Sequence, residues 1–254
     1  MRLIASNILS ISSQVLYGGI LMLKYSEGSL FNEDTTALVN AVNTVGVMGT
    51  GIALEFMLRY PDMFADYKLK CQAGEIRTGL VDYYRDPSGL VIVNFPTKWH
   101  FKYPSKLEWI EQGLKDFVST YQNFGITSVA FPKLGAGNGG LEWPIVQKMM
   151  EKYLSPLDAD IVICLDSQNH ASGIEKNMLS KFHLSDLDEL SRKIKLSAIQ
   201  KGNFKKHMPY NRFWQIRETE SIGLKTYSAL FRYFYQEESS DDKKQQQISL
   251  FDLQ

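Results

Sequence analysis

The stretch that decides the fold is TALVNAVN at residues 36–43, followed directly by TVGVMGTGIA at 44–53. Its first part is an apolar run with β-branched residues, which is typical of a buried strand, and the residues from Gly51 onward have the apolar spacing of a helix. Glycines between them let the backbone come close to a ligand, and the N-terminus of the helix offers free N–H groups. The stretch therefore predicts a strand, a phosphate-binding loop and a helix in succession.

A second glycine loop, PKLGAGNGGLEW at 132–143, also follows a strand-like run and precedes a helix-like one. Two such loops can hold both sides of one diphosphate. Either loop alone is equally consistent with glycines that only turn the chain, because single glycine motifs are weak signals. Neither loop is a P-loop, and the first has no obvious acidic residue at the position of a dinucleotide fingerprint. The residues alone support phosphate or nucleotide binding and no more.

Strand and helix patterns alternate along the first two thirds of the chain. Strand-like runs lie at 21–25, 36–42, 80–84, 90–95, 128–131 and 161–165, and helix-like runs lie at 51–59, 106–124 and 145–154. This alternation predicts an α/β domain with a largely parallel sheet, in which ligands bind beyond the carboxyl ends of the strands.

The composition is that of a globular protein. Of its 254 residues 44% are apolar, and 28 basic residues balance 28 acidic ones, so the net charge predicts no partner. Cys71 and Cys164 are too few for a disulfide framework or a zinc site, which favours a reducing cytoplasm. The sequence contains no apolar run long enough for a membrane span, no histidine spacing typical of a metal site, and no signal-peptide pattern at 1–20. We therefore expect a cytoplasmic protein with an N-terminal extension and with no cofactor, metal or membrane contact.

The character of the chain changes after about residue 184. Helix-like patterns cover 186–200 and 222–235, so residues 185–235 form a predicted helical unit. Between Arg192 and Arg217 this unit has eight basic residues, no acidic one and several aromatic ones. Such a stretch either binds DNA, through phosphates and stacked bases, or is a solvated helix face whose aromatic residues form a small core. A protein partner is a third alternative.

Residues 236–254 have the polar composition of a flexible, disordered tail. Near its end, the run Gln247, Ile248, Ser249, Leu250 and Phe251 resembles the pentapeptide that binds the bacterial sliding clamp. Two apolar anchors on a polar tether suit an extended peptide that fills a pocket, and the alternative is a frayed end with chance apolar residues. The resemblance implies a DNA sliding clamp as a partner.

Together the segments between residues 21 and 167 resemble the macrodomains, an α/β family that binds ADP-ribose. The resemblance rests on ALVNAVN followed by Gly-x-x-Gly-x-Gly-Ile-Ala, then on RYP at 59–61, NFPTKWH at 94–100 and LGAGNGGLEW at 134–143. It is closest to the DarG-type DNA ADP-ribosyl glycohydrolases, which are antitoxins that remove ADP-ribose from thymidine in DNA. The resemblance implies a three-layer α/β/α domain over residues 21–184, with a mixed, mostly parallel central sheet.

The resemblance also implies roles for individual residues. Asn43 would hydrogen-bond the hydroxyls of the distal ribose. The distal ribose and diphosphate would be wrapped by Gly46, Val47, Met48, Gly49 and Gly51. The diphosphate would be closed over from the other side by Gly135, Ala136, Gly137, Asn138 and Gly139. Further candidates for the lining of the site are Ser29, Thr97, Trp99 and His100. Many macrodomains have Gly-Asp where this chain has Gly28-Ser29, so adenine would be held differently here.

Lys98 matches the lysine that performs the chemistry in this branch of the family. A neutral amine can attack the anomeric carbon of the sugar and form a Schiff base, provided that burial or a neighbouring cation lowers its pKa. The alternative is a surface lysine that pairs with a phosphate. His100 lies two residues further on, so both side chains would share a face on a continued strand. Asn138-Gly139 stands where the branch acting on protein glutamates has an acid, which disfavours a lysine–aspartate mechanism.

We therefore expect a bacterial or phage-encoded ADP-ribosyl glycohydrolase that removes ADP-ribose from DNA, in repair or as an antitoxin. Its ligand would be ADP-ribose, its substrate ADP-ribosylated DNA, and a cognate ADP-ribosyltransferase toxin a further partner. The alternatives are a non-catalytic ADP-ribose reader, a hydrolase of protein-linked ADP-ribose or of ADP-ribose 1″-phosphate, and an adaptor that acts through its clamp-binding tail.

Overall fold

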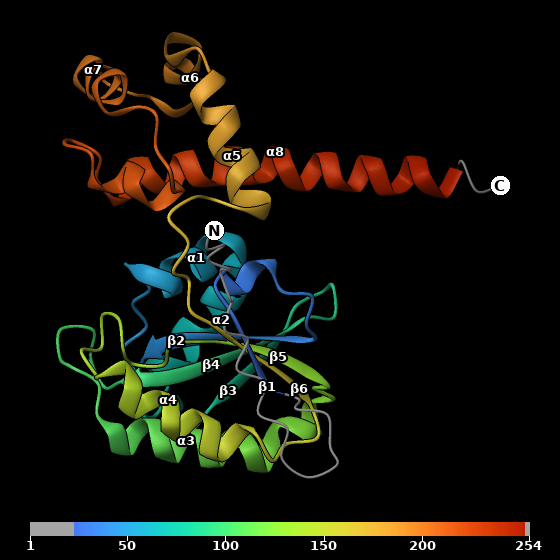
Figure 1. The fold of residues 1–254 in the computed structure, drawn as a ribbon. Helices are drawn as coiled ribbons and strands as arrows, with labels where there is room; N and C mark the ends of the chain where they lie inside the picture. The colour runs from blue at the N-terminus through green and yellow to red at the C-terminus, as the bar shows by residue number, and fades with distance from the viewer. Residues whose placement is uncertain (1–22, 252–254) are drawn as a thin grey trace, which may run out of the picture.

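A six-stranded sheet forms the centre of the first unit, in the order β1-β6-β5-β2-β4-β3 (Figure 1). The computed structural model describes residues 23–251, with side chains as far as Glu238, and the predicted extension at 1–20 lies outside the described residues. The strands are β1 (Leu23–Ser26), β2 (Ala37–Asn43), β3 (Asp82–Arg85), β4 (Val91–Lys98), β5 (Ser128–Pro132) and β6 (Asp160–Cys164). β3 runs antiparallel to β4, and the other neighbouring strands are parallel. The predicted mixed, mostly parallel sheet is confirmed.

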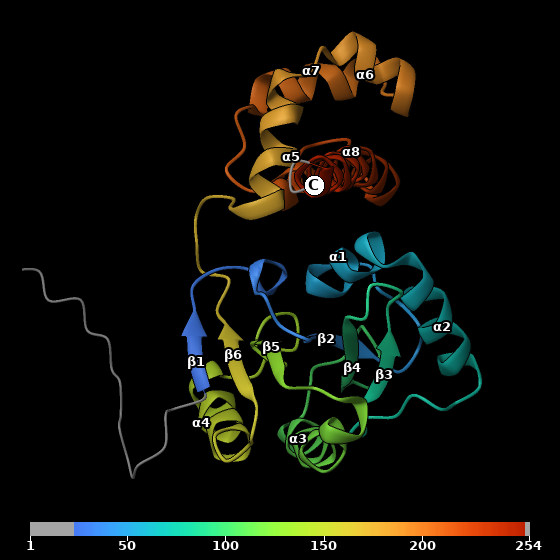
Figure 2. The ribbon, with the colours of Figure 1, turned by 90° about the vertical axis from the view of Figure 1, so that its right-hand side faces the viewer.

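Helices cover both faces of this sheet, which gives three layers (Figure 2). One face is covered by α1 (Gly51–Arg59) and α2 (Pro61–Gln72), the other by α3 (Leu107–Thr120) and α4 (Trp143–Leu154). Short 3-10 turns, η1 (Leu30–Asn32) and η2 (Tyr121–Phe124), follow β1 and α3. The α/β/α layering implied by the resemblance is therefore confirmed.

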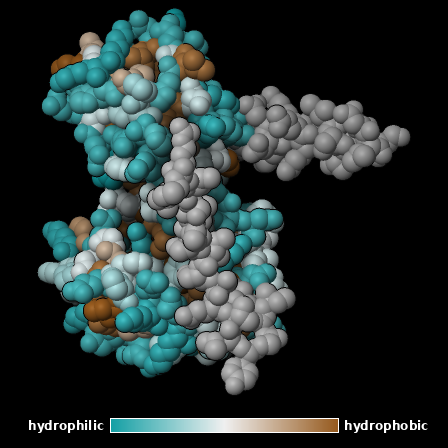
Figure 3. Space-filling model, in the orientation of Figure 1, coloured by the Kyte–Doolittle hydropathy of each residue, from teal (hydrophilic) through white to brown (hydrophobic). Residues whose placement is uncertain are grey.

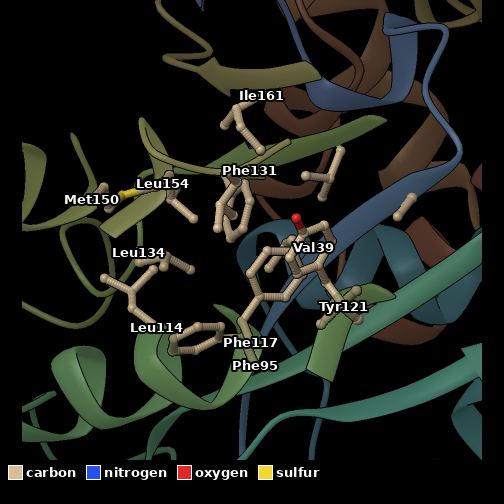
Figure 4. Packing of buried hydrophobic residues seen from close by; sticks show 14 of the residues in the cluster. Val39, Phe95, Leu114, Phe117, Tyr121, Phe131, Leu134, Met150, Leu154 and Ile161 are labelled. Carbon is tan, nitrogen blue, oxygen red and sulfur yellow. The ribbon is translucent and has the colours of Figure 1, made fainter. Parts of the chain in front are cut away.

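Side chains along the strands alternate between two hydrophobic clusters, one on each face of the sheet. The cluster toward α3 and α4 contains Phe95, Phe117 and Phe131 (Figure 4). The rings of Phe117 and Phe131 meet edge to face, with 5.2 Å between their centroids. The cluster toward α1 and α2 contains intervening residues of the same strands, such as Leu38 and Ile92. Because burial of each large side chain contributes about 1.5–3 kcal/mol, the two clusters together hold the strand ends in place.

Helix α2 is absent from the helices predicted from sequence. Only Met63 and Tyr67 are buried among its residues, so its apolar stripe is narrow and gives little periodic signal. Pro61 occupies the first turn, where a helix tolerates proline because no N–H is needed there. Tertiary contacts of two side chains therefore place a helix that the hydrophobic pattern does not reveal.

The C-terminal unit is helical and has its own core, beside α1 (Figure 1). It consists of α5 (Gly173–Leu184), α6 (Leu187–Ile194), α7 (Ala198–His207), the 3-10 turn η3 (Phe213–Glu218) and α8 (Leu224–Phe251). Met178, Leu179 and Phe182 of α5 lie in this second core, whereas the sequence prediction assigns residues up to 184 to the first unit. The chain leaves the sheet after β6, and the linker that follows it separates the two cores.

The predicted helix at 186–200 is wrong, because two helices occupy this region. Lys195 adopts a left-handed conformation, with φ of 58°, and ends α6. Ser197 then begins α7 through a capping box with Gln200. Further along the basic stretch, the aromatic residues Phe204 and Phe213 are buried in the second core, which agrees with the core alternative for these two side chains.

Helix α8 continues to Phe251, where the sequence predicts a flexible tail that carries an extended peptide. The chain has neither proline nor glycine after Gly223, and glutamate, lysine and glutamine in this segment are good helix formers, so nothing local breaks the helix. The side chains of residues 239–251, which include the clamp-like run at 247–251, lie outside the described ones. None of the helices in the described part of the chain is long and apolar enough to cross a membrane.

The two units share helix α1. Its Phe56 packs in the cluster against the sheet, whereas Leu54 and Leu58 belong to the second core. Arg59 at its end pairs with Glu55 at 2.6 Å, and its guanidinium lies over the rings of Phe31, at 4.3 Å, and Tyr235, at 4.9 Å. One helix thus carries apolar contacts to both units, which fixes the C-terminal unit on the first.

We predict that Gly113→Ala lowers the free energy of unfolding by about 1–3 kcal/mol, as expected for overpacking. A Cβ at Gly113 in α3 would lie 2.6 Å from Cε1 of Phe95, whose ring is fully buried. Gly202 in α7 is the matched control, because a Cβ there meets nothing within 4 Å, so Gly202→Ala should be neutral or slightly stabilising. Urea unfolding followed by circular dichroism measures both variants. Equal effects of the two substitutions would contradict this packing.

Candidate functional site

The carboxyl ends of β2 and β4 bring two predicted site residues together. These strands are parallel neighbours, and their register pairs Asn43 with Lys98 after an irregularity at Val42. Each strand end is followed by a loop, and the second glycine loop follows β5 at the same edge of the sheet. The predicted site therefore lies where ligands bind in α/β sheets, beyond the carboxyl ends of the strands.

Asn43 shapes the first glycine loop. Its Nδ2 donates to the carbonyl of Val47 at 2.6 Å, and its Oδ1 accepts from the backbone N–H of Val45 at 3.0 Å. The hydroxyl of Tyr67 donates to the backbone carbonyl of Asn43 at 2.5 Å. In this structure the Asn43 amide is therefore used inside the loop, and its predicted contact with a ribose stays a prediction.

The other residues of the first loop divide into those that point inward and those that face the site. The Met48 side chain is buried in the cluster below the loop, so only its backbone can take part in wrapping a ligand. Val47 is exposed. Gly46 and Gly51 have positive φ values of 77° and 59°, which explains the need for glycine at both positions.

The second loop depends on glycine for close packing. A Cβ at Gly139 would collide with the carbonyl oxygen of Gly135 and with Oγ of Ser105. The N–H of Ser105 also donates to the carbonyl of Gly139, at 2.9 Å. Gly139 is buried, whereas Gly137 and Asn138 are exposed and Ala136 is half-buried. The tip of this loop is therefore what the structure offers to a ligand, and its base is structural.

Asn138 joins the two loops to Lys98. The Lys98 amine donates a hydrogen bond to the carbonyl oxygen of Asn138. The side-chain amide of Asn138 lies so close to α1 that a Cβ at Gly51 would sit 2.8 Å from its Nδ2. One residue of the second loop thus contacts Lys98 through its backbone and the N-terminus of α1 through its side chain.

Lys98 has the surroundings that favour an uncharged amine. It is half-buried, and no carboxylate of the described residues lies within ion-pair distance of it. Burial lowers the pKa of the Lys98 amine from its ordinary value, since desolvation disfavours the charged form. A lysine without a carboxylate partner among the described residues therefore stands at the end of β4, and its predicted role as nucleophile stays a prediction.

The neighbours of Lys98 take different positions. Thr97 is buried, and its hydroxyl donates to the carbonyl of Val42 at 3.4 Å. β4 ends at Lys98, so His100 lies in a bend, where its Nδ1 accepts from the N–H of Lys102 at 3.2 Å. The argument that His100 and Lys98 share a strand face is therefore wrong, because the strand does not continue to residue 100.

Trp99, Phe101 and Tyr103 form an exposed aromatic cluster beside Lys98. The rings of Trp99 and Tyr103 stack at 5.9 Å with an interplanar angle of 11°, and 57% of Trp99 is exposed. The carbonyl of Trp99 accepts from the hydroxyl of Thr44 at 2.6 Å, so the cluster is tied to the first glycine loop. Packing in a hydrophobic core does not account for these rings, because all three are exposed.

A cavity of about 500 Å³ lies between the two units, and Asn138 is among its lining residues. The space-filling view shows that the molecule narrows between these units (Figure 3). From the first unit it is lined by Ser29, Phe31, Thr50, Gly51, Glu55, Asn138 and Asp166, and from the C-terminal unit by Arg212, Trp214, Arg217 and Tyr227, among others. Lys98 is not among its lining residues. The candidate site thus has two parts, the region around Lys98 and the cavity, and Asn138 contacts both.

The residues from the C-terminal unit are the part of the site that the sequence analysis missed. Arg212, Trp214 and Arg217 lie in the acid-free basic stretch, and that stretch was the sequence feature that could have indicated them. The sequence analysis considered it only as a DNA-binding segment, a contact for a protein partner or a solvated helix face. Arg217 donates to the carbonyl of Gly49 at 2.6 Å, across 168 residues of sequence. No pattern local to either segment reveals such a contact.

Charges around the cavity are mostly paired. Arg212 bridges Asp166 at 2.9 Å and Glu175 at 3.0 Å. Glu55 pairs with Arg59, and burial raises the pKa of the Glu55 carboxyl while Arg59 opposes that shift. Within the described residues no three His, Cys, Asp or Glu side chains gather in a way that would hold a metal ion.

The Macro domain family model matches residues 39–150, from β2 into α4. The solved macrodomain of Mycobacterium tuberculosis DarG is similar over 58% of this chain and 98% of its own length, at 44% identity and a TM-score of 0.55. The chain belongs to the macrodomain family. The match of the family model ends within α4, so the helices from α5 onward lie outside it.

Two further relatives of this macrodomain name an activity and a ligand. A curated DNA ADP-ribosyl glycohydrolase of Thermus aquaticus is 44% identical over 140 residues, which are 54% of this chain and 39% of that protein. Thermosipho africanus DarTG, solved in complex with ADP-ribose, is 34% identical with a TM-score of 0.55, over 61% of this chain and 44% of the other. The chain thus spans about two fifths of the length of the curated relative.

Proposed function

We propose that this macrodomain removes ADP-ribose from modified DNA, with thymidine-linked ADP-ribose as the substrate and Lys98 as the nucleophile. The observation that carries the proposal is the position of Lys98 beside both glycine loops, without a carboxylate partner among the described residues. The names of the relatives support it, since one is a DNA ADP-ribosyl glycohydrolase and another was solved with ADP-ribose bound.

The diphosphate of ADP-ribose fits between the two loops. Thr50 makes no side-chain hydrogen bond that caps α1, so the first N–H groups of this helix are available to an anion. Asn138 at the tip of the second loop lines the same cavity as Thr50 and Gly51. Phosphates held in this way would present the distal ribose to Lys98, which supplies the proximity that the reaction needs.

The chemistry follows from a neutral amine at this position. An uncharged lysine that donates one hydrogen bond to the Asn138 carbonyl keeps its lone pair for attack. Nζ bonds to the anomeric carbon as the bond between that carbon and the thymine nitrogen breaks, and the proton that the amine then loses passes to that nitrogen. Opening of the sugar ring gives a Schiff base with Lys98, and water then releases ADP-ribose and the free amine.

The aromatic cluster of Trp99, Phe101 and Tyr103 favours DNA as the carrier of ADP-ribose. Exposed rings next to the reacting group can stack on unpaired bases, and each stacked base contributes about 1–3 kcal/mol. Lys102 adds positive charge beside these rings, with its Nζ 5.9 Å from the centroid of Phe101. A single-stranded nucleic acid suits this surface better than a glutamate side chain, which has no ring to stack.

Partners beyond the substrate rest on the sequence alone. We propose the run Gln247–Phe251 as a sliding-clamp contact and an ADP-ribosyltransferase toxin as a cognate partner, because the first resembles a clamp peptide and the second follows from the likeness to antitoxins. A cytoplasmic location and a part in DNA repair likewise stay predictions. A non-catalytic reader and a hydrolase of protein-linked ADP-ribose stay alternatives that the following experiment separates. A hydrolase of ADP-ribose 1″-phosphate stays a further alternative.

We predict that Lys98→Ala abolishes release of ADP-ribose from thymidine-modified single-stranded DNA, by about three orders of magnitude or more, and leaves binding of free ADP-ribose intact. Wild type should release label from this DNA and not from glutamate-modified protein. Borohydride reduction during turnover should trap ADP-ribose on Lys98, as mass spectrometry of the digested protein would show. Lys148→Ala, an exposed lysine on α4, is the control. Wild type that binds ADP-ribose but releases nothing would instead identify a reader.

The rate of release should rise with pH and then level off. Only the unprotonated amine attacks, so the rate increases as pH rises through the pKa of Lys98. Burial lowers this pKa, so the increase in rate should occur at a lower pH than that at which an ordinary lysine titrates, about 10.4. Single-turnover rates across the pH range measure this profile. A rate that falls with rising pH would contradict the amine as nucleophile.

We predict that Trp99→Ala and Tyr103→Ala each lower kcat/KM on modified DNA by about five- to a hundredfold, because each removes a stacking surface. Affinity for free ADP-ribose should not change, since the rings lie outside the nucleotide. Trp99→Phe should retain most of the activity. Leu69→Ala, which alters an equally exposed apolar side chain on α2, is the control. Loss of ADP-ribose affinity in the Trp99 variant would place the ring against the nucleotide instead.

A further inference from the structure

The cavity between the two units extends from the glycine loops away from Lys98. One wall is formed by η1 and the N-terminus of α1, and the other by η3 and the start of α8. Its volume of about 500 Å³ lies within the range of small-molecule sites. The C-terminal unit, which the family model does not cover, therefore forms half of a cavity that begins at the proposed diphosphate position.

We propose that the C-terminal unit completes the nucleotide site, with Arg217 binding the diphosphate of ADP-ribose and Trp214 packing against its adenine. This inference rests on the proposed function, because that function sets the direction of ADP-ribose in the site. If the distal ribose faces Lys98 and the diphosphate lies between the loops, the adenosine half must extend past Asn138 into the cavity.

Arg217 lies beside the first glycine loop and has hydrogen-bond donors that no described residue uses. Its Nη1 donates to the carbonyl of Gly49, one residue before the N-cap of α1. A guanidinium has five N–H donors, and this is the one hydrogen bond of Arg217 among the described residues. No carboxylate of those residues lies within ion-pair distance of it. A half-buried cation held against an anion-binding loop, with unused donors, suits a bidentate contact to phosphate.

Arg212, five residues before Arg217, differs from it because both of its charge partners are carboxylates of the protein. It is buried, and it contacts Asp166, Glu175 and the carbonyl of Gln168, at 2.9 to 3.0 Å. These contacts hold η3 against the first unit. With its charge balanced by two carboxylates, Arg212 has no role left for a ligand phosphate, and it positions the turn that carries Trp214 and Arg217.

The far part of the cavity suits a flat aromatic ring. Trp214 remains 47% exposed although the neighbouring Phe213 and Ile216 are buried in the second core. Phe31 and Tyr227 line the same cavity from η1 and α8. The Trp214 indole therefore lies outside the core of the C-terminal unit and lines a cavity that two further aromatic rings also line. In this position it can stack on a purine.

The arrangement is held together strongly enough to form a site. Leu54 and Leu58 of α1 are buried in the core of the C-terminal unit. Arg59 is stacked on Phe31 of the first unit and on Tyr235 of the second. Separation of the two units would expose these side chains, so we expect the cavity walls to keep their positions when a ligand enters.

The test measures affinity of the full chain for ADP-ribose by titration calorimetry, with ADP and ribose 5-phosphate as fragments. Arg217→Ala should weaken ADP-ribose and ADP by about ten- to a hundredfold, as loss of a charge-assisted contact implies. Trp214→Ala should weaken both about fivefold or more and Trp214→Phe much less. Ribose 5-phosphate should be unaffected by the Trp214 variants, because it has no base.

Matched controls come from exposed residues of the same unit. Arg192→Ala removes an exposed arginine of α6, and Ile199→Ala an exposed apolar side chain of α7, and neither should change affinity. Arg217→Gln, with thermal unfolding as a check, replaces Arg217→Ala if that variant fails to fold.

Three outcomes are decisive. Unchanged ADP-ribose affinity in the Arg217 and Trp214 variants overturns this inference and leaves the Lys98 chemistry untouched. Tighter binding in the Arg217 variants also overturns it, since the contact to Gly49 would then block the site. If wild type binds no ADP-ribose at all, the proposed function fails first, and the two failures are thereby distinguished.

Discussion

A buried hydrogen bond between two asparagines sets the geometry of the site. Nδ2 of Asn40 on β2 donates to Oδ1 of Asn94 on β4 at 3.1 Å, and the two residues are direct partners in the parallel register. Both are fully buried, so a slip of one residue would break this hydrogen bond and leave a buried donor of Asn40 and a buried acceptor of Asn94 without it, at about 1–3 kcal/mol each. It would also turn each side chain of one strand to the opposite face. This register brings Asn43 and Lys98 side by side, and both glycine loops follow from that edge.

Helix α1 links this edge to the rest of the molecule. Its N-terminus lies at the first loop, its Phe56 packs on the sheet, and its Leu54 and Leu58 pack in the second core. The same nine-residue helix therefore positions the N–H groups that we propose bind the diphosphate, and it also holds the C-terminal unit beside them. A displacement of the C-terminal unit would act on the phosphate cradle through this helix, because few other elements connect the two cores.

The sequence was sufficient to predict those parts of the structure that depend on a local residue pattern. Glycine at 46 and 51 is required by positive φ, and the strand before the loop is apolar apart from its two asparagines, so the strand, loop and helix were predictable. Lys98 was found by its motif. Side-chain direction was not predictable: Met48 turns into the core, and the Asn43 amide closes its own loop. Contacts such as that between Arg217 and Gly49 depend on how two units dock, which no local pattern records.

The distribution of charge partners separates structural cations from those available to a ligand. Arg59 and Arg212 face carboxylates and lie inside the contact between the units. Lys98 and Arg217 donate to backbone carbonyls, and no carboxylate of the described residues pairs with either. Unpaired cations cost free energy when they are desolvated unless an anion compensates them. Burial lowers the pKa of the Lys98 amine, so this side chain can lose its proton more readily than an ordinary lysine, whereas a guanidinium cannot. Arg217 therefore has the stronger need for an anionic ligand. A diphosphate between the two loops would meet that need and would leave the neutral amine free for the sugar.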